Sequence, residues 1–267
     1  MTAMHDSYQT LLVERPHADV LLVTMNRPEA MNAMNTQMGH DMAHLFDALA
    51  AHPDTCRAVV LTGAGTRAFC AGGDLKQRRG MTDPQWQAQH HVFERKVRAM
   101  IDCPVPLIAA VNGAAYGGGC EMALSCDFIY AATTARFALP EVTLGIMPGA
   151  GGTQNLPRAV GERRAKELLL SGRPWSAHDA ERWGMVNQVC NPETLVAEAV
   201  ATATTIAANA PISIRQAKRS IHHGLNMSLS DGLLFEIEAY NRMVPTEDRR
   251  EGVLAFNEKR KPNFKGR

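Results

Sequence analysis

The chain has 267 residues, of which 45% are hydrophobic and 21% charged, and its 28 basic and 27 acidic side chains leave a net charge of +1. This composition is that of an ordinary globular protein, long enough for one large domain and a smaller appendage. So small a charge excludes a global field that would draw the chain to nucleic acid or an anionic membrane. An anionic ligand must therefore be bound by local groups.

The N-terminal residues lack the apolar run behind a basic start that marks a secretory leader, and no stretch approaches the roughly 20 apolar residues of a membrane span. We therefore expect a cytoplasmic protein that does not enter membranes. His40 and His44 share one face of an expected helix, but its apolar stripe lies near the opposite side and no His-Glu-x-x-His motif accompanies them. We expect no metal site.

Short β-type runs alternate with helical patterns from about residue 10 to residue 190, which predicts an α/β fold. A helix is expected over Asn35–Ala51. Several strands run directly into Gly, Asn or Pro, as is typical of strand ends that build functional sites. The expected strands are Val20–Met25, Ala58–Thr62, Leu107–Val111, Phe128–Ala131 and Met185–Val189.

The β-type runs end after about residue 190, and helical patterns follow one another. We therefore divide the chain into a core, residues 1–195, and a helical C-terminal module, residues 196–267. One of these helices has an apolar face that four helices alone could hardly cover, so we expect it to pack on the core or on another subunit. The expected helices are Glu193–Asn209, Ile212–His223, Leu229–Met243 and Asp248–Lys259.

The first glycine-rich stretch, Gly63–Ala68, fits the dinucleotide-binding pattern Gly-x-Gly-x-x-Ala in its letters. The glycines that follow at Gly72 and Gly73 would break the helix that such a site needs, and the acid at the end of a second strand is missing. A P-loop is excluded because the chain has no Gly-Lys-Ser/Thr.

The second glycine cluster, Gly117–Gly119, opens a short apolar helix. Unpaired N–H groups at a helix N-terminus can receive the negative charge that develops on a carbonyl oxygen, and glycine lets the ligand approach the backbone. The alternative is that these glycines only permit a tight contact between helix and strand. A second donor is expected from Ala71–Asp74.

Two glutamates lie in otherwise apolar, glycine-rich segments. Glu121 is in the first turn of the short helix, and Glu141 follows Pro140. Taken singly, each has a plain reading, as a favourable charge at a helix N-terminus or as an ordinary loop residue. Together with the glycines downstream of Glu141 they predict one pocket, in which two acids hold a water and move protons beside exposed amides. Such a pocket suits addition or removal of water at an activated acyl group.

Several segments, in the right order across nearly the whole chain, resemble the enoyl-CoA hydratase/isomerase (crotonase) family. The resemblance implies a spiral of β-β-α units, a C-terminal helical trimerisation module, and trimers or hexamers built as paired trimers. The segments that carry it are Asn26–Ala33, Phe69–Leu75, Asn112–Glu121, Leu139–Glu141, Gly145–Gln154 and Glu258–Phe264.

The resemblance also implies roles for individual residues. The backbone N–H groups of Gly73 and Gly118 would hold the thioester oxygen. Glu121 and Glu141 would be the catalytic acids, and Gly149 would lie near the catalytic water. The substrate is then an acyl-CoA thioester, so that CoA is part of the substrate and no separate cofactor is implied. The segments that bind CoA and substrate would contribute Arg27, Ala30, Ala71, Asp74, Leu75, Lys76, Pro140 and Leu144.

Retention of both glutamates favours an enoyl-CoA hydratase, which adds water reversibly to trans-2-enoyl-CoA, because many isomerases of the family keep only the acid at the Glu141 position. An enoyl-CoA isomerase or a specialised acyl-CoA dehydratase stays open, since one oxyanion hole serves many reactions. A noncatalytic CoA-ester binder or an RNA-binding relative is the alternative of another class, and neither would need both acids. We expect the acyl group to lie against Lys76–Val97, including Trp86 and Phe93, and against Tyr116, and its length stays open.

Overall fold

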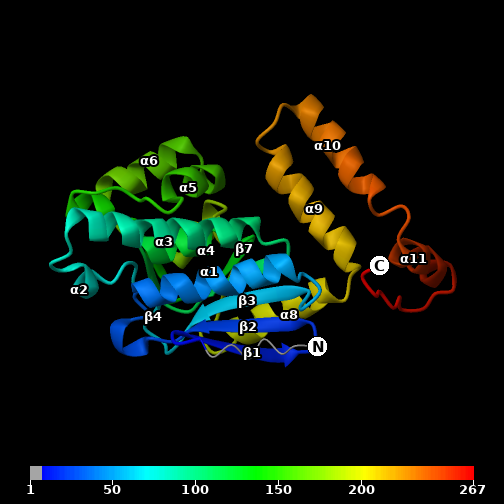
Figure 1. Cartoon of the computed structure of the whole chain (residues 1–267), viewed down its shortest axis with the longest axis horizontal. Coiled ribbons are helices and arrows are strands. Elements are labelled where there is room, and N and C mark those ends of the chain that lie inside the picture. The colour runs from blue at the N-terminus through cyan, green and yellow to red at the C-terminus, as the bar shows by residue number, and fades with distance from the viewer. Residues whose placement is uncertain (1–7) are drawn as a thin grey trace.

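The computed structural model describes residues 8–267, in which two sheets are covered by helices and further helices stand away from the sheets (Figure 1). The larger sheet, in spatial order, consists of β1 (Leu11–His17), β2 (Val20–Met25), β3 (Ala58–Gly63), β5 (Leu107–Val111), β7 (Phe128–Ala132) and β10 (Gln188–Cys190). The smaller sheet consists of β4 (Ala68–Cys70), β6 (Ala114–Tyr116), β8 (Arg136–Ala138) and β9 (Trp175–Ser176).

The chain repeats one unit of structure three times. Strands β3, β5 and β7 lie side by side and parallel in the larger sheet, and the strand after each of them, β4, β6 or β8, lies in the smaller sheet. A helical segment follows each pair before the next unit begins. This is the α/β spiral of β-β-α units that the sequence led us to expect.

Helices cover the larger sheet closely. Helices α1 (Thr36–Ala51) and α3 (Asp83–Asp102) pack against each other, and α8 (Leu195–Ala207) packs on β2, β3, β5 and β7. Strands β3 and β5 are buried along their whole length, as is usual for parallel strands in a covered sheet. The shorter helical elements are η1 (Pro28–Ala30), α2 (Leu75–Arg78), α4 (Gly118–Leu124), η2 (Glu141–Leu144), α5 (Gly152–Val160), α6 (Glu162–Ser171) and α7 (Ala177–Arg182).

Local sequence signals fix the starts of helices α1, α2 and α3. Asn35 caps α1, because its Oδ1 accepts a hydrogen bond from Met38 N at 2.9 Å. Thr82 and Gln85 form a capping box at the start of α3, where Gln85 Oε1 accepts from Thr82 N at 2.9 Å. Asp74 caps α2, because its Oδ1 accepts hydrogen bonds from Lys76 N and Gln77 N.

Four of the five expected strands coincide with observed ones within a residue or two at their ends, but the strand expected at Met185–Val189 was wrong in its first half. The N–H groups of Met185 and Val186 donate to Ala180 O and close the end of α7, so the chain joins the sheet only at Gln188. The smaller sheet was not anticipated. Its strands have two or three residues each, too few to show a period in the sequence.

The C-terminal helices α9 (Pro211–Gly224), α10 (Leu229–Asn241) and α11 (Glu247–Asn257) extend away from the sheets (Figure 1). Helix α8 packs on the larger sheet, so the first helix of the expected 196–267 module lies against the core, and the division at residue 195 stays a prediction. Within residues 8–267 no single helix is long and apolar enough to cross a membrane. Only the pair α8 and α9, bent by 107°, passes such a test jointly.

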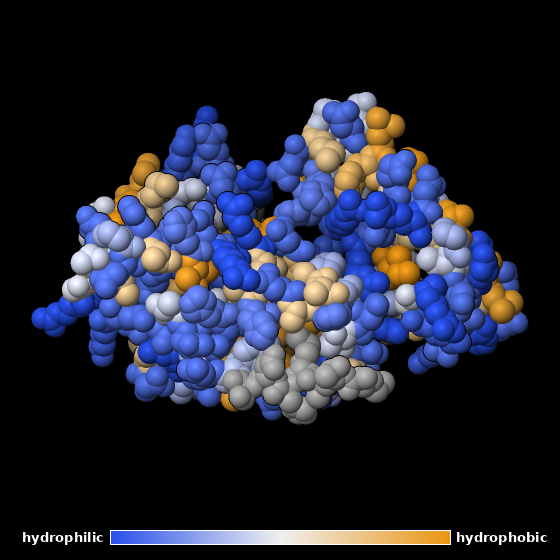
Figure 2. Space-filling view, in the orientation of Figure 1, coloured by the Kyte–Doolittle hydropathy of each residue, from blue (hydrophilic) through white to orange (hydrophobic). Residues whose placement is uncertain are grey.

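The apolar face of α10 is not covered by the rest of the described chain. Its large side chains are between 53% and 80% exposed, and Figure 2 shows apolar atoms gathered over this part of the molecule. A face of this size usually marks a contact surface. Its members are Leu229, Leu233, Leu234, Ile237 and Tyr240.

The basic C-terminal tail, residues 258–267, folds back onto α11 and the core. Arg260 forms two hydrogen bonds with the carboxylate of Glu251, at 2.6 and 2.9 Å. The buried carboxylate of Asp248 accepts from the N–H groups of Lys265 and Gly266. These hydrogen bonds tie the tail to α11.

Candidate active site

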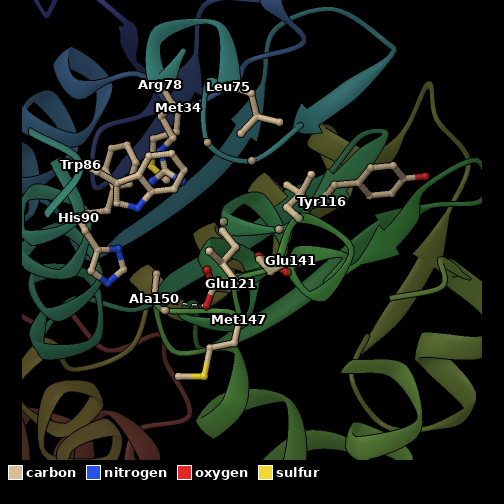
Figure 3. Close-up of a pocket in the computed structure, with 18 of the residues that line it drawn as sticks. Met34, Leu75, Arg78, Trp86, His90, Tyr116, Glu121, Glu141, Met147 and Ala150 are labelled. Carbon is tan, nitrogen blue, oxygen red and sulfur yellow. Dashed lines mark hydrogen bonds between the residues drawn. The ribbon is translucent and has the colours of Figure 1, made fainter. Parts of the chain in front are cut away.

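A cavity of about 710 Å³ lies between the ends of strands β4, β6 and β8 of the smaller sheet and the helices α2 and α3. Its walls carry apolar side chains, glycine backbone and two acids, and Figure 3 shows the principal side chains around it. The lining residues that bear on the chemistry are Gly73, Gly118, Glu121, Glu141 and Gly149, and those that form the apolar wall are Met34, Leu75, Trp86, Phe93, Tyr116, Leu144, Ile146 and Met147.

Glu121 is buried in the first turn of α4 and is held by backbone donors. Its Oε1 accepts hydrogen bonds from Ala150 N at 2.8 Å and from Gly152 N at 2.9 Å. These donors lie just before α5 and at its first residue, and Figure 3 shows the bond to Ala150. Because Oε1 is engaged by two N–H groups, the carboxylate has a fixed orientation and its Oε2 is left for a ligand in the cavity.

Glu141 is the first residue of η2 and is also buried, but its surroundings differ. Within the described residues its Oε2 has no hydrogen-bond partner. Burial raises the pKa of Glu141 to about 7; its own backbone N–H opposes this rise, and the nearby charge of Glu121 adds to it. At neutral pH Glu141 therefore exists in both protonated and ionised forms, as a proton donor requires.

Two backbone amides border the same space. A Cβ built on Gly118 would lie 3.9 Å from Gly73 N, so the two N–H groups are close neighbours although they are far apart in sequence. Within residues 8–267 neither N–H donates a hydrogen bond to a protein acceptor. A pair of unpaired donors in a cavity can hold one oxygen atom that gains negative charge.

Close backbone contacts hold this pair in place. A Cβ built on Gly119 would lie 2.0 Å from Cys70 O, so only glycine lets α4 approach the end of β4 so closely. Gly117, before the helix, has φ +51, and its N–H donates to Ala138 O at 2.9 Å. The glycines therefore serve both the helix contact and the exposed amides, the two readings that the sequence left open.

The sequence model of the enoyl-CoA hydratase/isomerase family matches residues 15–267. The chain belongs to the enoyl-CoA hydratase/isomerase family.

Similar proteins of this family cover almost the whole chain. A short-chain-enoyl-CoA hydratase from Clostridium acetobutylicum is 40% identical over 93% of this chain and 95% of its own length. A 2,3-dehydroadipyl-CoA hydratase from Escherichia coli is 39% identical over 96% of this chain and 99% of its own length. The crystal structure of an enoyl-CoA hydratase from Bacillus anthracis superposes with a TM-score of 0.95 at 40% identity, covering 97% of this chain and 100% of that one.

The cavity brings together nine of the thirteen residues that the sequence singled out. The two acids, the two amide-bearing glycines and Gly149 all line it, as do Ala71, Leu75, Pro140 and Leu144. Arg27, Ala30, Asp74 and Lys76 do not line it. Arg27 and Asp74 pair with each other at 3.0 Å, and Asp74 caps α2, so the structure gives them a local packing role. Lys76 is exposed, and a CoA contact for these four residues stays a prediction.

The lining also contains polar residues that the sequence did not single out. Arg78, Gln87, His90 and His91 come from α2 and α3 and face the same cavity. The missed signal was the spacing of Trp86 and Phe93. They lie seven residues, or about two helix turns, apart and so present one face of α3 on which a nearby cation can rest.

No group of three or more His, Cys, Asp or Glu side chains is placed to hold a metal ion in the part of the chain that the structure describes. His40 and His44 are both exposed on α1, opposite the buried side of that helix.

Proposed function

We propose that this protein is an enoyl-CoA hydratase, which adds water reversibly to a trans-2-enoyl-CoA and gives the 3-hydroxyacyl-CoA. The observation that carries the proposal is the unequal pair of buried acids in one cavity with two unpaired amides. One acid is fixed by two N–H groups, and the other has a raised pKa of about 7. The names of similar proteins of the same family support the same reaction.

In this proposal the thioester oxygen is held by the N–H groups of Gly73 and Gly118. An enoyl thioester is a weak electrophile until negative charge can collect on that oxygen, and two aimed donors stabilise the enolate-like state. The donors are in place before substrate arrives, because the contact of α4 with β4 fixes them.

Glu121 and Glu141 divide the proton transfers between them. Glu121, ionised and oriented through Oε1, accepts a proton from the water that attacks C3 of the acyl chain. Glu141, protonated, delivers a proton to C2. The nearby charge of Glu121 helps to keep the proton on Glu141, which suits this division. Gly149 borders the same space and is proposed to lie beside the water.

The remaining expectations follow from this function. CoA is part of the substrate, and no separate cofactor is needed. Ala71, Leu75, Pro140 and Leu144, which line the cavity, are proposed to contact the thioester and the pantetheine end of CoA. The exposed apolar face of α10 supports self-association into a trimer or a pair of trimers. We propose that the protein works in the cytoplasm.

The test is the ultraviolet absorbance of the conjugated thioester. Purified protein should remove the absorbance of crotonyl-CoA as water adds across the double bond. With a 3-enoyl-CoA, a gain of absorbance faster than this loss would identify an isomerase instead. A double variant Glu121→Gln/Glu141→Gln with unchanged turnover would favour the noncatalytic or RNA-binding alternative.

A further inference from the structure

One charged side chain in the cavity has no part in the proposed hydration. Arg78, the last residue of α2, is the one lysine or arginine among the described residues that line the cavity. Its guanidinium carbon lies 4.2 Å from the centre of the Trp86 ring and 5.5 Å from that of Phe93. Figure 3 shows Arg78 and Trp86 together, across the cavity from Glu121 and Glu141.

A buried glutamine fixes the orientation of Arg78. Arg78 Nε donates to Gln89 Oε1 at 2.8 Å, and Gln89 Nε2 donates to Thr36 Oγ1 and Gln77 Oε1, both at 2.9 Å. Within residues 8–267, Nη1 and Nη2 have no acceptor, and no Asp or Glu forms an ion pair with the guanidinium. The free edge presents parallel N–H donors, the geometry that matches a carboxylate.

The position of Arg78 distinguishes it from the other cations nearby. Its Cζ lies 3.4 Å from a Cβ built on Gly73, beside the amide that we propose holds the thioester oxygen. Burial lowers the pKa of Arg78, because its charge has lost water without gaining an acid. Lys76 lies on the same short helix and Arg79 directly follows it. Both are exposed and can bind solvated phosphates. A half-buried cation in an aromatic wall suits an anion that enters the cavity with the acyl chain.

We infer that the acyl group of the substrate carries a terminal carboxylate, which Arg78 binds through Nη1 and Nη2. The preferred substrate is then the CoA monothioester of an unsaturated dicarboxylic acid. This inference rests on the proposed hydration and specifies its substrate class. Bound there, the carboxylate stays away from Glu121 and Glu141 on the opposite wall. An uncharged acyl chain would leave the desolvated N–H groups of Arg78 without an acceptor, and its binding is therefore disfavoured.

The first experiment compares two substrates with the same number of chain carbons, 2,3-dehydroadipyl-CoA and trans-2-hexenoyl-CoA. The wild type should have the higher kcat/KM for the carboxylated substrate. Arg78→Met should lower that value about ten- to hundredfold, the effect of losing hydrogen bonds between charged groups, and should leave hexenoyl-CoA nearly unchanged. Arg79→Met, the matched control on the exposed neighbour, should alter neither. Equal losses on both substrates would mean that Arg78 serves CoA or the thioester oxygen and would overturn the inference, as would no loss on either.

The second experiment needs neither a variant nor turnover. Calorimetric titration of the wild type with adipyl-CoA and hexanoyl-CoA, both saturated, should show tighter binding of adipyl-CoA. Equal affinities, or tighter hexanoyl-CoA, would overturn the inference even if Arg78→Met does not fold. If adipyl-CoA is preferred but no enoyl-CoA is hydrated, the proposed reaction fails and the carboxylate site stands.

Discussion

Glu121 and Glu141 line one cavity, but N–H groups of a distant segment, at Ala150 and Gly152, bind Oε1 of Glu121 alone of the two acids. Within residues 8–267 Oε2 of Glu141 has no hydrogen-bond partner, and burial raises the pKa of Glu141 to about 7. Two identical side chains thus acquire different chemistry from their surroundings. Backbone donors favour the ionised form of a carboxylate, and burial disfavours it. The contrast assigns the base and the acid of the proposed reaction.

The first prediction concerns pH. The proposed hydration needs a proton on Glu141, so kcat/KM should be level well below pH 7 and should fall as pH rises through about 7, approaching tenfold per unit. Hydration neither releases nor takes up a proton, so its equilibrium constant is independent of pH. The dehydration rate should therefore fall in parallel. Rates of hydration and dehydration measured from pH 6 to 9 check this. Opposite trends would contradict the prediction that both directions depend on the same protonation state.

The second prediction separates the two acids. Glu121→Gln and Glu141→Gln should each lower kcat for crotonyl-CoA by about 10²–10⁴-fold, the usual contribution of general acid–base catalysis. Only Glu121→Gln should retain the fall in rate above pH 7, provided its residual rate can be measured. Calorimetric binding of a saturated acyl-CoA should change little in either variant. Lost binding would indicate that the acids shape the site rather than move protons.

The third prediction uses adjacent glycines of α4. In Gly118→Ala the new methyl lies 3.1 Å from the flexible end of Met34 and 3.9 Å from Gly73 N, in the space proposed for the thioester oxygen. The fold should survive while kcat falls about 10²–10³-fold. In Gly119→Ala the methyl meets Cys70 O at 2.0 Å, so the protein should lose thermal stability. Melting temperature and activity of both variants distinguish the roles, and a fully active Gly118→Ala would argue against the oxyanion site.

The fourth prediction concerns Lys96 of α3, which is completely buried and whose Nζ has no hydrogen-bond partner among the described residues. Burial lowers the pKa of Lys96 below its ordinary value of 10.5, and nearby Cys70 and Glu121 only partly oppose this. Lys96→Met removes an unpartnered polar group and should raise the free energy of unfolding by about 1–3 kcal/mol at neutral pH.

The same variant gives a pH signature. The unfolded chain keeps a proton on Lys96 at pH values where the folded protein has lost it, so this residue makes stability rise with pH up to about its ordinary pKa of 10.5. Lys96→Met should lose that rise. Urea unfolding of both proteins between pH 7 and 10 measures it, and a variant less stable throughout would show that Lys96 has a partner in solution.

The fifth prediction concerns the exposed face of α10. If this face is a subunit contact, the variant Leu234→Glu/Ile237→Glu should sediment as a monomer while the wild type sediments as a trimer or larger. Leu170 on α6, which is more exposed than either of these residues, provides the control, and Leu170→Glu should leave the assembly unchanged. A monomeric wild type would refute self-association directly.

The sequence predicted four of the six strands of the larger sheet, and β2, β3 and β5 were recognisable because they are largely apolar runs that end at or just before Gly or Asn. It missed the edge strand β1, whose side chains are mostly exposed. The sequence also brought Glu121 and Glu141 together through the glycines around them. It did not predict the smaller sheet, whose short strands are defined by their partners. Arg78 escaped notice because its environment depends on Trp86 and Gln89, which reach it only when α3 folds over α2.

Two separate sets of groups line the cavity. Main-chain groups and the acids, anchored by the contact of Gly119 with β4, carry out the proposed chemistry. Side chains of α2 and α3 form the wall that we propose faces the acyl group. Selectivity can therefore evolve by exchange of a few residues on one wall while the reaction itself is preserved. A library randomised at Arg78, Trp86 and His90 should yield active catalysts with new chain preferences far more often than one randomised at residues 117–121.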